Sequence, residues 1–358
     1  MGDSKMNKNK ERKFDIGINT PPEGYKASLK SRVIVAIILL ILFVPSFFLG
    51  GYFFFGAVSL FVVLAILEMI FAPHRRYGWY VYVVTFVVTI TYIYWATFKA
   101  NIAAYLANPS DFVFSLESEY FSYGIPVFGI CASLIFYFLI AILDKNFDFS
   151  DVAYFFTFTL LIGLGFQAAY ALRYYCAYLA LGPFKDFVWF DGLSSMDVVT
   201  SAFFRYFLSA CPLILMVGGA LFNDTAAYFG GIYFGKHKMN ERVSPHKTWE
   251  GFAFGVAGGF LFSFLFMMIL AGVGYPILPF LTLDKWYWIL LISILIPLLG
   301  DLGDLSFSLI KRFLHIKDYG NVLKGHGGIL DRVDSMLFCA LGLMMIFSLI
   351  ERGWNLLS

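Results

Sequence analysis

The segment from Trp286 to Asp334 reads WYWILLISILIPLLGDLGDLSFSLIKRFLHIKDYGNVLKGHGGILDRVD. It starts as an apolar run of the kind that crosses a membrane as a helix, and charged residues crowd the sequence where that run ends. Asp301 and Asp304 close the run, and Asp331 and Asp334 repeat their spacing. Ionisable groups beside a bilayer are costly, so this cluster indicates a site. The alternative, a solvated basic loop between two helices, does not explain the carboxylates at the end of the apolar run.

The composition of the whole chain is that of a membrane protein. Of the 358 residues, 60% are hydrophobic and only 14% are charged, whereas soluble domains carry about 25% charged residues. The formal net charge of +2 gives no reason to expect nucleic acid as a partner. The four cysteines show no metal-ligand spacing, and we expect buried thiols at Cys131, Cys176, Cys211 and Cys339.

The order of apolar segments predicts an all-α, polytopic fold. Nine segments are suited to membrane helices, at 33–50, 52–71, 79–98, 124–143, 152–172, 203–222, 252–272, 286–305 and 333–350. Residues 1–32 are polar and basic, which is typical of a cytoplasmic tail and not of a cleavable signal peptide. We divide the remainder into N-terminal helices at 33–200 and a C-terminal region at 201–358 that holds the charged motifs.

The distribution of basic residues predicts the orientation. With the N-terminus inside, the cytoplasmic connections hold 20 Lys and Arg residues and the opposite ones hold 6. The loops 223–251 and 301–334 then face the cytoplasm, where nucleotides are found, and the C-terminus lies outside.

The carboxylates suggest a magnesium site. Asp301 and Asp304 share one helix face, and if the helix that begins near Asp331 and Asp334 is its neighbour, up to four carboxylates converge. Mg²⁺ prefers such oxygen ligands and completes its shell with water and substrate phosphates, as in phosphoryl and nucleotidyl transfer. The alternative is a structural network in which Asp331 pairs with Arg332 or Lys311.

Glycines precede the last two aspartates. In Gly325-His326-Gly327-Gly328 they would let backbone N–H groups turn toward a phosphate at a helix start. A tight turn also needs glycine, so the run has two interpretations. His326 would donate to a phosphate or assist proton transfer, or would simply satisfy the turn.

A second polar block extends from Asn223 to Gly251. Asn223 and Asp224 stand at the end of an apolar span, and residues 223–235 either prolong that helix or form a broken one. Ser244-Pro245 predicts a helix start with Ser244 as the N-cap, from which Lys247 would reach a bound phosphate. The alternative is a hinge with an interfacial anchor at Trp249.

Together, the two blocks resemble the CDP-diacylglycerol synthases, or phosphatidate cytidylyltransferases, which are integral membrane enzymes. That family has Ser-x-x-Lys-Arg, then Lys-Asp, then His-Gly-Gly-x-x-Asp-Arg-x-Asp, and here these positions are Ser308, Lys311, Arg312, Lys317, Asp318, His326, Gly327, Gly328, Asp331, Arg332 and Asp334. The upstream family element matches Asp224, Tyr228–Gly231 and Ser244–Gly251. The resemblance covers roughly residues 220–350, and the first 200 residues match only as a run of membrane helices.

The sequence departs from the family pattern at two positions. Phe307 stands where an acidic residue is usual, and Lys324 stands where proline is common. Asp301 stands where relatives often have an uncharged polar residue, which leads to the hypothesis that Asp301 replaces the lost carboxylate.

The resemblance implies that CTP and phosphatidic acid give CDP-diacylglycerol and pyrophosphate, with Mg²⁺ and with room for a monovalent cation such as K⁺. By resemblance, we expect Asp304 and Asp331 as the first metal ligands, with Asp334 and Asp224 next, and catalytic contributions from Asp304, Asp331, Lys311, Arg312 and His326. Asp301 joins the expected metal ligands through the replacement hypothesis and not through the resemblance. Substrate contacts are expected from Asn223, Asp224, Ser244, Lys247, Lys317, Gly327, Gly328 and Arg332. The lipid bilayer is a further partner, a homodimer is left open, and a bacterial plasma membrane is the expected location.

Rival functions are less well supported by the residues. An enzyme that uses CTP with another lipid phosphate has the same site and is separable only by assay. A CDP-alcohol phosphotransferase would need an Asp-Gly-x-x-Ala-Arg arrangement that the sequence lacks. A transporter would use the intramembrane charges for an ion path, but it predicts matching halves with broken helices, and both charged loops fall in the second half.

Overall fold

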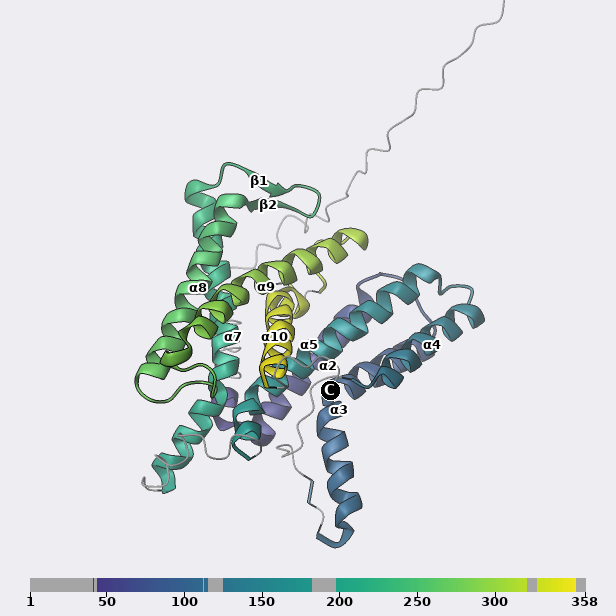
Figure 1. Ribbon diagram of the computed structural model, residues 1–358. Helices are drawn as coiled ribbons and strands as arrows, with labels where there is room; N and C mark the ends of the chain where they lie inside the picture. Colours follow the sequence, from purple (N-terminus) through teal and green to yellow (C-terminus); the bar gives the residue numbers. More distant parts are fainter. Residues whose placement is uncertain are drawn as a thin grey trace, which may run out of the picture.

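The computed structural model describes Ile41 and residues 44–111, 113–114, 125–181, 198–320 and 327–351, with the backbone alone at 111, 176–181, 198–206 and 351. Within these ranges, seven helices are long and apolar enough to cross a membrane (Figure 1). An eighth apolar helix, α4 (Val127–Leu143), has 17 residues. The predicted all-α, polytopic fold is confirmed. The predicted tail 1–32 and most of the predicted span 33–50 lie outside the described residues.

Each predicted span after the first coincides with a helix. Their bounds are α2 Gly51–Phe71, α3 Trp79–Ala107, α4 as above, α5 Phe149–Leu181, α7 Val198–Phe234, α8 Trp249–Gly272, α9 Trp286–Phe313 and α10 Leu330–Glu351. Two short 3₁₀ turns, Pro109–Asp111 and Leu283–Lys285, lie between them. Several helices exceed the predicted span because backbone hydrogen bonds continue past the last apolar residue. The domain boundaries and the side of the N-terminus stay predictions.

Helix α7 continues without a break through residues 223–234, so of the two predicted alternatives the prolonged helix is observed. Tertiary packing supports this continuation. A Cβ atom at Gly230 would lie 2.4 Å from the Phe254 side chain, which shows how closely α7 approaches α8 there.

Small residues hold α7, α8 and α9 together. The buried residues of α8 recur every fourth position, at Gly251, Gly255, Gly259, Ser263 and Met267. A Cβ at Gly255 would lie 2.9 Å from that of Ala227 on α7, and one at Gly259 would lie 2.9 Å from that of Pro297 on α9. Small residues let helix backbones approach closely where lipid supplies no hydrophobic drive for association. These three helices therefore form a close-packed group.

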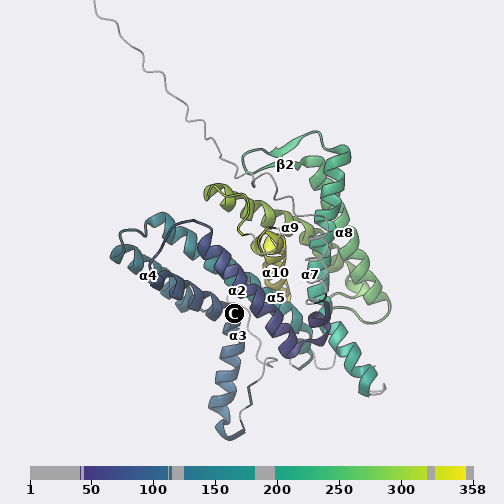
Figure 2. The ribbon, with the colours of Figure 1, turned by 180° about the vertical axis from the view of Figure 1, so that it is seen from behind.

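The N-terminal helices pack mainly through aromatic and hydroxyl side chains. Tyr137 on α4 is buried, and its hydroxyl bonds to Thr159 at 2.8 Å and donates to Thr85 at 3.2 Å. Helix α5 joins the two parts of the chain, since it packs against α2, α3 and α4 and also against α7 and α10 (Figure 2). The thiols of Cys211 and Cys339 are buried as predicted, but Cys131 is exposed on α4, because that helix buries few of its residues.

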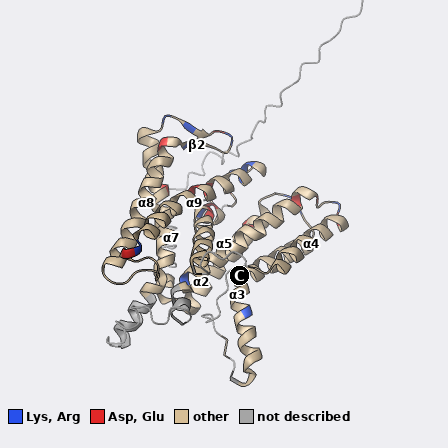
Figure 3. Cartoon of the chain, in the orientation of Figure 1, with Lys and Arg blue, Asp and Glu red and all other residues tan. Residues whose placement is uncertain are grey.

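A short antiparallel hairpin, β1 (Lys238–Asn240) and β2 (Ser244–Thr248), connects α7 to α8. In both ribbon views it lies on the same side of the molecule as the C-terminal end of α9. Charged residues are sparse along the helices and more frequent on the hairpin and at helix ends (Figure 3). The hairpin therefore places polar residues next to the ends of apolar helices.

Candidate active site

One face of α9 carries the polar residues at its C-terminal half. Asp301, Asp304, Ser308 and Lys311 follow each other at intervals of three or four residues, so they form a stripe along the helix. Ser308 donates to Asp304 Oδ1 at 3.3 Å. Asp301 is only 5% exposed, which is unusual for a carboxylate in an apolar helix.

Lys247 reaches this stripe from the hairpin. Its Nζ lies 2.8 Å from Asp304 Oδ2 and 3.5 Å from Asp301 Oδ1. Burial alone would lower the pKa of Lys247, but the negative charge of Asp304 and the carboxylates around it hold the pKa above its ordinary value. The ammonium group therefore stays protonated at neutral pH.

The prediction of a helix start at Ser244 is wrong. Ser244 lies on β2, and α8 begins at Trp249, where Thr248 is the N-cap and its hydroxyl accepts from Gly251 N–H at 3.1 Å. The chain pairs Asn240 with Ser244 across the hairpin, and this strand pairing overrides the local Ser-Pro signal. Lys247 therefore approaches α9 from a strand.

The stripe and Lys247 line a cavity of about 530 Å³, which is within the range of small-ligand sites. Helices α7, α8 and α9 and the hairpin form its walls. The lining residues are Asp224, Ala227, Tyr228, Gly231, Ile232, His246, Lys247, Thr248, Gly251, Phe252, Asp301 and Asp304. The structure thus joins the predicted residues Asp224, Lys247, Asp301 and Asp304 in one place.

Beside the cavity, several buried polar atoms have no hydrogen-bond partner among the described residues. They are Asp301 Oδ2 and both side-chain polar atoms of Asn223, which is fully buried. A Cβ at Gly255 would lie 2.9 Å from Asn223 Oδ1, so this amide is enclosed between α7 and α8. Buried polar atoms normally have partners, and an exception calls for an explanation, such as a bound ion or water or a catalytic role.

These oxygens suit a hard cation. Mg²⁺ takes one or two protein carboxylates and fills its shell with water and phosphate oxygens, and Asp301 and Asp304 supply such a pair. Among the residues that the structure describes, no three His, Cys, Asp or Glu side chains come close enough together to hold an ion by themselves. Asp301 and Asp304 are thus the carboxylates of the cavity whose chemistry would suit a magnesium ion, and the ion itself stays a prediction.

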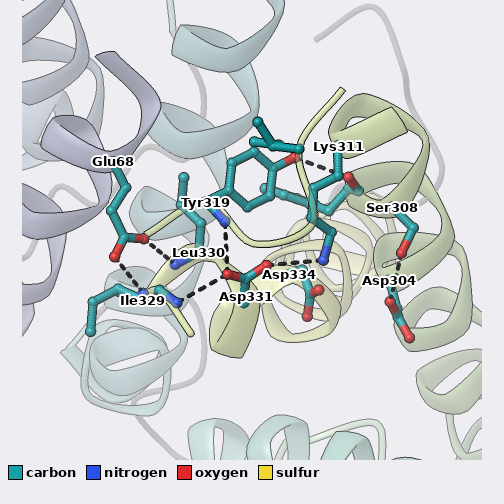
Figure 4. Close-up of polar contacts among 12 residues, drawn as sticks. Glu68, Asp304, Ser308, Lys311, Tyr319, Ile329, Leu330, Asp331 and Asp334 are labelled. Carbon is teal, nitrogen blue, oxygen red and sulfur yellow. Dashed lines mark hydrogen bonds and ion pairs between the residues drawn. The ribbon is translucent and has the colours of Figure 1, made fainter. Parts of the chain in front are cut away.

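Asp331 and Lys311 form a second, separate cluster. Lys311 Nζ lies 2.9 Å from Asp331 Oδ1, and Asp331 Oδ2 accepts from the N–H groups of Tyr319 at 2.9 Å and Gly328 at 3.0 Å (Figure 4). The alternative in which Asp331 pairs with Lys311 is therefore observed. Both Asp331 oxygens accept hydrogen bonds within this cluster, and Lys311 is its ion-pair partner, whereas Asp304 pairs with Lys247.

The other predicted residues are spread around these clusters. Asp334 is buried one turn along α10, next to α9, where Gly303 would place a Cβ 2.6 Å from the Asp334 carbonyl oxygen. The two helices are thus neighbours, which was the condition for their carboxylates to approach one another. Arg312 donates to the carbonyl of Val243 at 3.1 Å and so holds the hairpin. Lys317 and Arg332 are exposed, and His326 lies outside the described residues.

Phe307 does not face the carboxylates. It is fully buried and makes edge-to-face contacts with Phe158, Tyr319 and Phe338. Asp301 faces Lys247 instead, so it does not lie where a carboxylate at position 307 would lie. The hypothesis that Asp301 replaces the lost acid is not supported by this placement.

Sequence reasoning missed two polar residues at the second cluster, Glu68 and Tyr319. Glu68 and Tyr319 hold the start of α10 and the preceding loop. Asp318, a position of the family motif, keeps an exposed side chain, and partial burial and then the charge of Asp331 raise its pKa. Glu68 had a visible signal, because it is a lone carboxylate in the apolar segment 52–71.

Comparison with known proteins places most of the chain in one group. The model of a family described as the cytidylyltransferase family matches residues 30–350. This match extends well beyond the 220–350 stretch that the motifs alone indicated.

Individual relatives match shorter stretches. The chain is 39% identical over 133 residues to a phosphatidate cytidylyltransferase of Bacillus subtilis (strain 168), which is 37% of this chain and 44% of that protein. It is 34% identical over 199 residues to phosphatidate cytidylyltransferases of Staphylococcus epidermidis (strain ATCC 12228 / FDA PCI 1200) and Staphylococcus aureus (strain COL), covering 55% of this chain and 60% of each relative. The aligned part thus spans about half the length of these relatives.

Proposed function

This chain belongs to the cytidylyltransferase family, and from that premise we propose that it transfers the cytidylyl group of CTP to phosphatidic acid. The observation that carries the proposal is the cavity in which Lys247 meets Asp301 and Asp304 at the ends of apolar helices. Relatives at 34–39% identity are named phosphatidate cytidylyltransferases, and that name supplies the substrate.

The reaction is an in-line displacement at phosphorus. A phosphate oxygen of phosphatidic acid forms a bond to the α-phosphorus of CTP, and the bond from that phosphorus to the oxygen bridging to the β-phosphorus breaks. The products are CDP-diacylglycerol and pyrophosphate. The attacking phosphate is already ionised at neutral pH, so positioning and electrostatic stabilisation are the main requirements.

Lys247 supplies a fixed positive charge for this step. Its ammonium group remains protonated because of the surrounding carboxylates, and it lines the cavity where two anionic reactants must meet. Asp304 and Asp301 orient that ammonium. Asp301, Asp304 and the amide of Asn223 are the groups that would hold Mg²⁺, which when bound would neutralise phosphate charge.

The second cluster supports the site from one side. Asp331 fixes Lys311 through an ion pair and fixes the loop backbone through two amides. Further phosphate contacts are proposed for Arg312, Lys317, Arg332, Ser244 and His326, with Gly327 and Gly328 shaping the loop and Asp334 behind it. A monovalent cation and a homodimer stay open in this proposal.

The proposed location is a bacterial plasma membrane with the cavity at the cytoplasmic surface. The relatives named above are bacterial. Basic residues are concentrated on the side of the predicted connections that holds the hairpin and the loop before α10.

The test is turnover by the purified, full-length protein in detergent. CTP and phosphatidic acid are supplied with Mg²⁺ or with a chelator, and both pyrophosphate and CDP-diacylglycerol are measured. We expect equal amounts of the two products, and no product with the chelator. UTP and ATP serve as nucleotide controls, and a prenyl phosphate serves as the lipid control.

The controls separate the alternatives. Turnover with the prenyl phosphate but not with phosphatidic acid would replace the lipid substrate in this proposal. Folded protein that forms no product with either lipid would contradict a cytidylyltransferase activity altogether.

A further inference from the structure

Glu68 is a buried carboxylate near the C-terminal end of α2. It is 5% exposed, and its two oxygens accept hydrogen bonds from the N–H groups of Ile329 at 2.8 Å and Leu330 at 2.9 Å (Figure 4). No Lys or Arg forms an ion pair with it in the part of the chain that the structure describes. A buried carboxylate in a membrane helix is costly. Its two backbone N–H partners therefore explain why the residue is there.

The two amides belong to the start of α10. The first N–H groups of a helix lack partners within the helix, and the helix dipole favours an anion there. Glu68 supplies both the acceptors and the negative charge from a residue 261 positions earlier in the chain than Ile329. It therefore caps α10 from another helix.

Two glycines make room for this carboxylate. A Cβ at Gly328 would lie 2.5 Å from Glu68 Oε2, and one at Gly320 would lie 2.7 Å from Oε1. The glycines thus precede and follow residues 321–326 in the sequence, and both lie against Glu68. Part of the glycine requirement before α10 comes from this approach of a protein carboxylate.

Glu68 and Asp331 hold consecutive amides of the same turn. Gly328 donates to Asp331, and Ile329 and Leu330 donate to Glu68. Asp331 in turn binds Lys311. A shift of the helix start would therefore move the Asp331–Lys311 pair with it.

We propose that Glu68 is a positioning residue for the transfer reaction, which keeps Asp331 and Lys311 in place by fixing the N-terminus of α10. This inference rests on the proposed function. It assigns to the N-terminal helices, which carry none of the signature residues, a direct part in ordering the active site.

The experiment compares Glu68→Ala and Glu68→Gln with the wild-type protein. We measure kcat and KM for CTP at saturating lipid, and hydrogen exchange of the amides at 328–331. The shape-preserving Glu68→Gln keeps only one good acceptor, so we expect about a tenfold loss of kcat, and about 100-fold for Glu68→Ala, with KM nearly unchanged. Exchange at Ile329 and Leu330 is expected to become faster in both variants.

Tyr137→Phe is the matched control. It removes two buried hydrogen bonds among the N-terminal helices without touching α10, and we expect its kcat to equal that of the wild type. If Glu68→Ala does not fold, Glu68→Gln decides the question.

The outcomes are distinct. Wild-type kcat in Glu68→Gln, or a loss no larger than that in Tyr137→Phe, would overturn the positioning role. If the wild-type protein has no activity, the proposed function fails instead. Faster exchange at 329–330 in the variants would then show only a structural cap, and the positioning role would fall with the function.

Discussion

Two lysine–carboxylate clusters lie along the same face of α9 and differ in how much of their side chains is exposed. Lys247 and Asp304 are 26% and 29% exposed and open into a cavity, with an unpartnered Asp301 oxygen beside them. Lys311 and Asp331 are 12% and 7% exposed, and both Asp331 oxygens accept hydrogen bonds. Residue types alone do not distinguish the open cluster from the enclosed one. The difference lies in unsatisfied polar atoms and in access.

The sharpest test of this comparison is Asp331→Asn. Removing one partner leaves Lys311 as a buried, unpaired charge, which costs about 3–5 kcal/mol. We therefore expect activity and thermal stability to fall together, measured as turnover and as Tm in detergent. The double variant Lys311→Met, Asp331→Asn should recover part of the Tm. An inactive Asp331→Asn protein with unchanged Tm would show that Asp331 contacts the reactants directly.

Asp304→Asn should behave in the opposite way. Its carboxylate orients Lys247 in an open cavity, so its loss should lower kcat by about 100-fold or more and leave Tm within a degree or two of the wild-type value. Turnover and thermal unfolding of the same preparation check this. A large fall in Tm would mean that the ion pair of Lys247 and Asp304 also stabilises the fold.

Asp301→Asn should have a smaller effect on kcat, of about tenfold, because one carboxylate of the proposed pair remains. Its main effect should be a weaker dependence on Mg²⁺, measured as a higher Mg²⁺ concentration at half-maximal rate. Phe307→Leu is the matched control on the same helix, since Phe307 faces the aromatic core. A Mg²⁺ titration unchanged from wild type would exclude Asp301 from the metal site.

Asp318→Asn should have the smallest effect. Asp318 is exposed, and partial burial with the nearby charge of Asp331 raises its pKa, so the folded state slightly disfavours its charged form at pH values above its ordinary pKa. Replacing it should raise Tm slightly at about pH 7, and the gain should vanish only as the pH falls below about 3, where the acid is neutral in both states. A gain that persists at low pH would have another cause.

Much of the fold followed from the sequence because membrane helices are selected by a local property. Apolar runs long enough to span lipid have few structural options, and the helices α2 and α8 match the predicted spans within three residues. Local rules failed where strand pairing intervened, as at Ser244, which is not a helix cap. Local rules also did not predict where α7 ends, because its continuation past residue 222 depends on contact with α8.

The spacing in the sequence identified the motif residues, but it did not show which of them lie together in the folded protein. Asp304 and Asp331 look equivalent in sequence, and only the approach of Lys247 from β2 and of Lys311 along α9 separates them. Glu68 lies too far along the chain from α10 for any local pattern to connect the two.

The sequence by itself determined the class of fold, the membrane setting and the residue types available for handling phosphates, because hydropathy and motif spacing are properties of short stretches. The tertiary structure decided which carboxylates are open and which are closed. Charges and hydrogen bonds act over a few ångströms in space, and residues hundreds of positions apart, such as Glu68 and Leu330, become neighbours only when the helices pack.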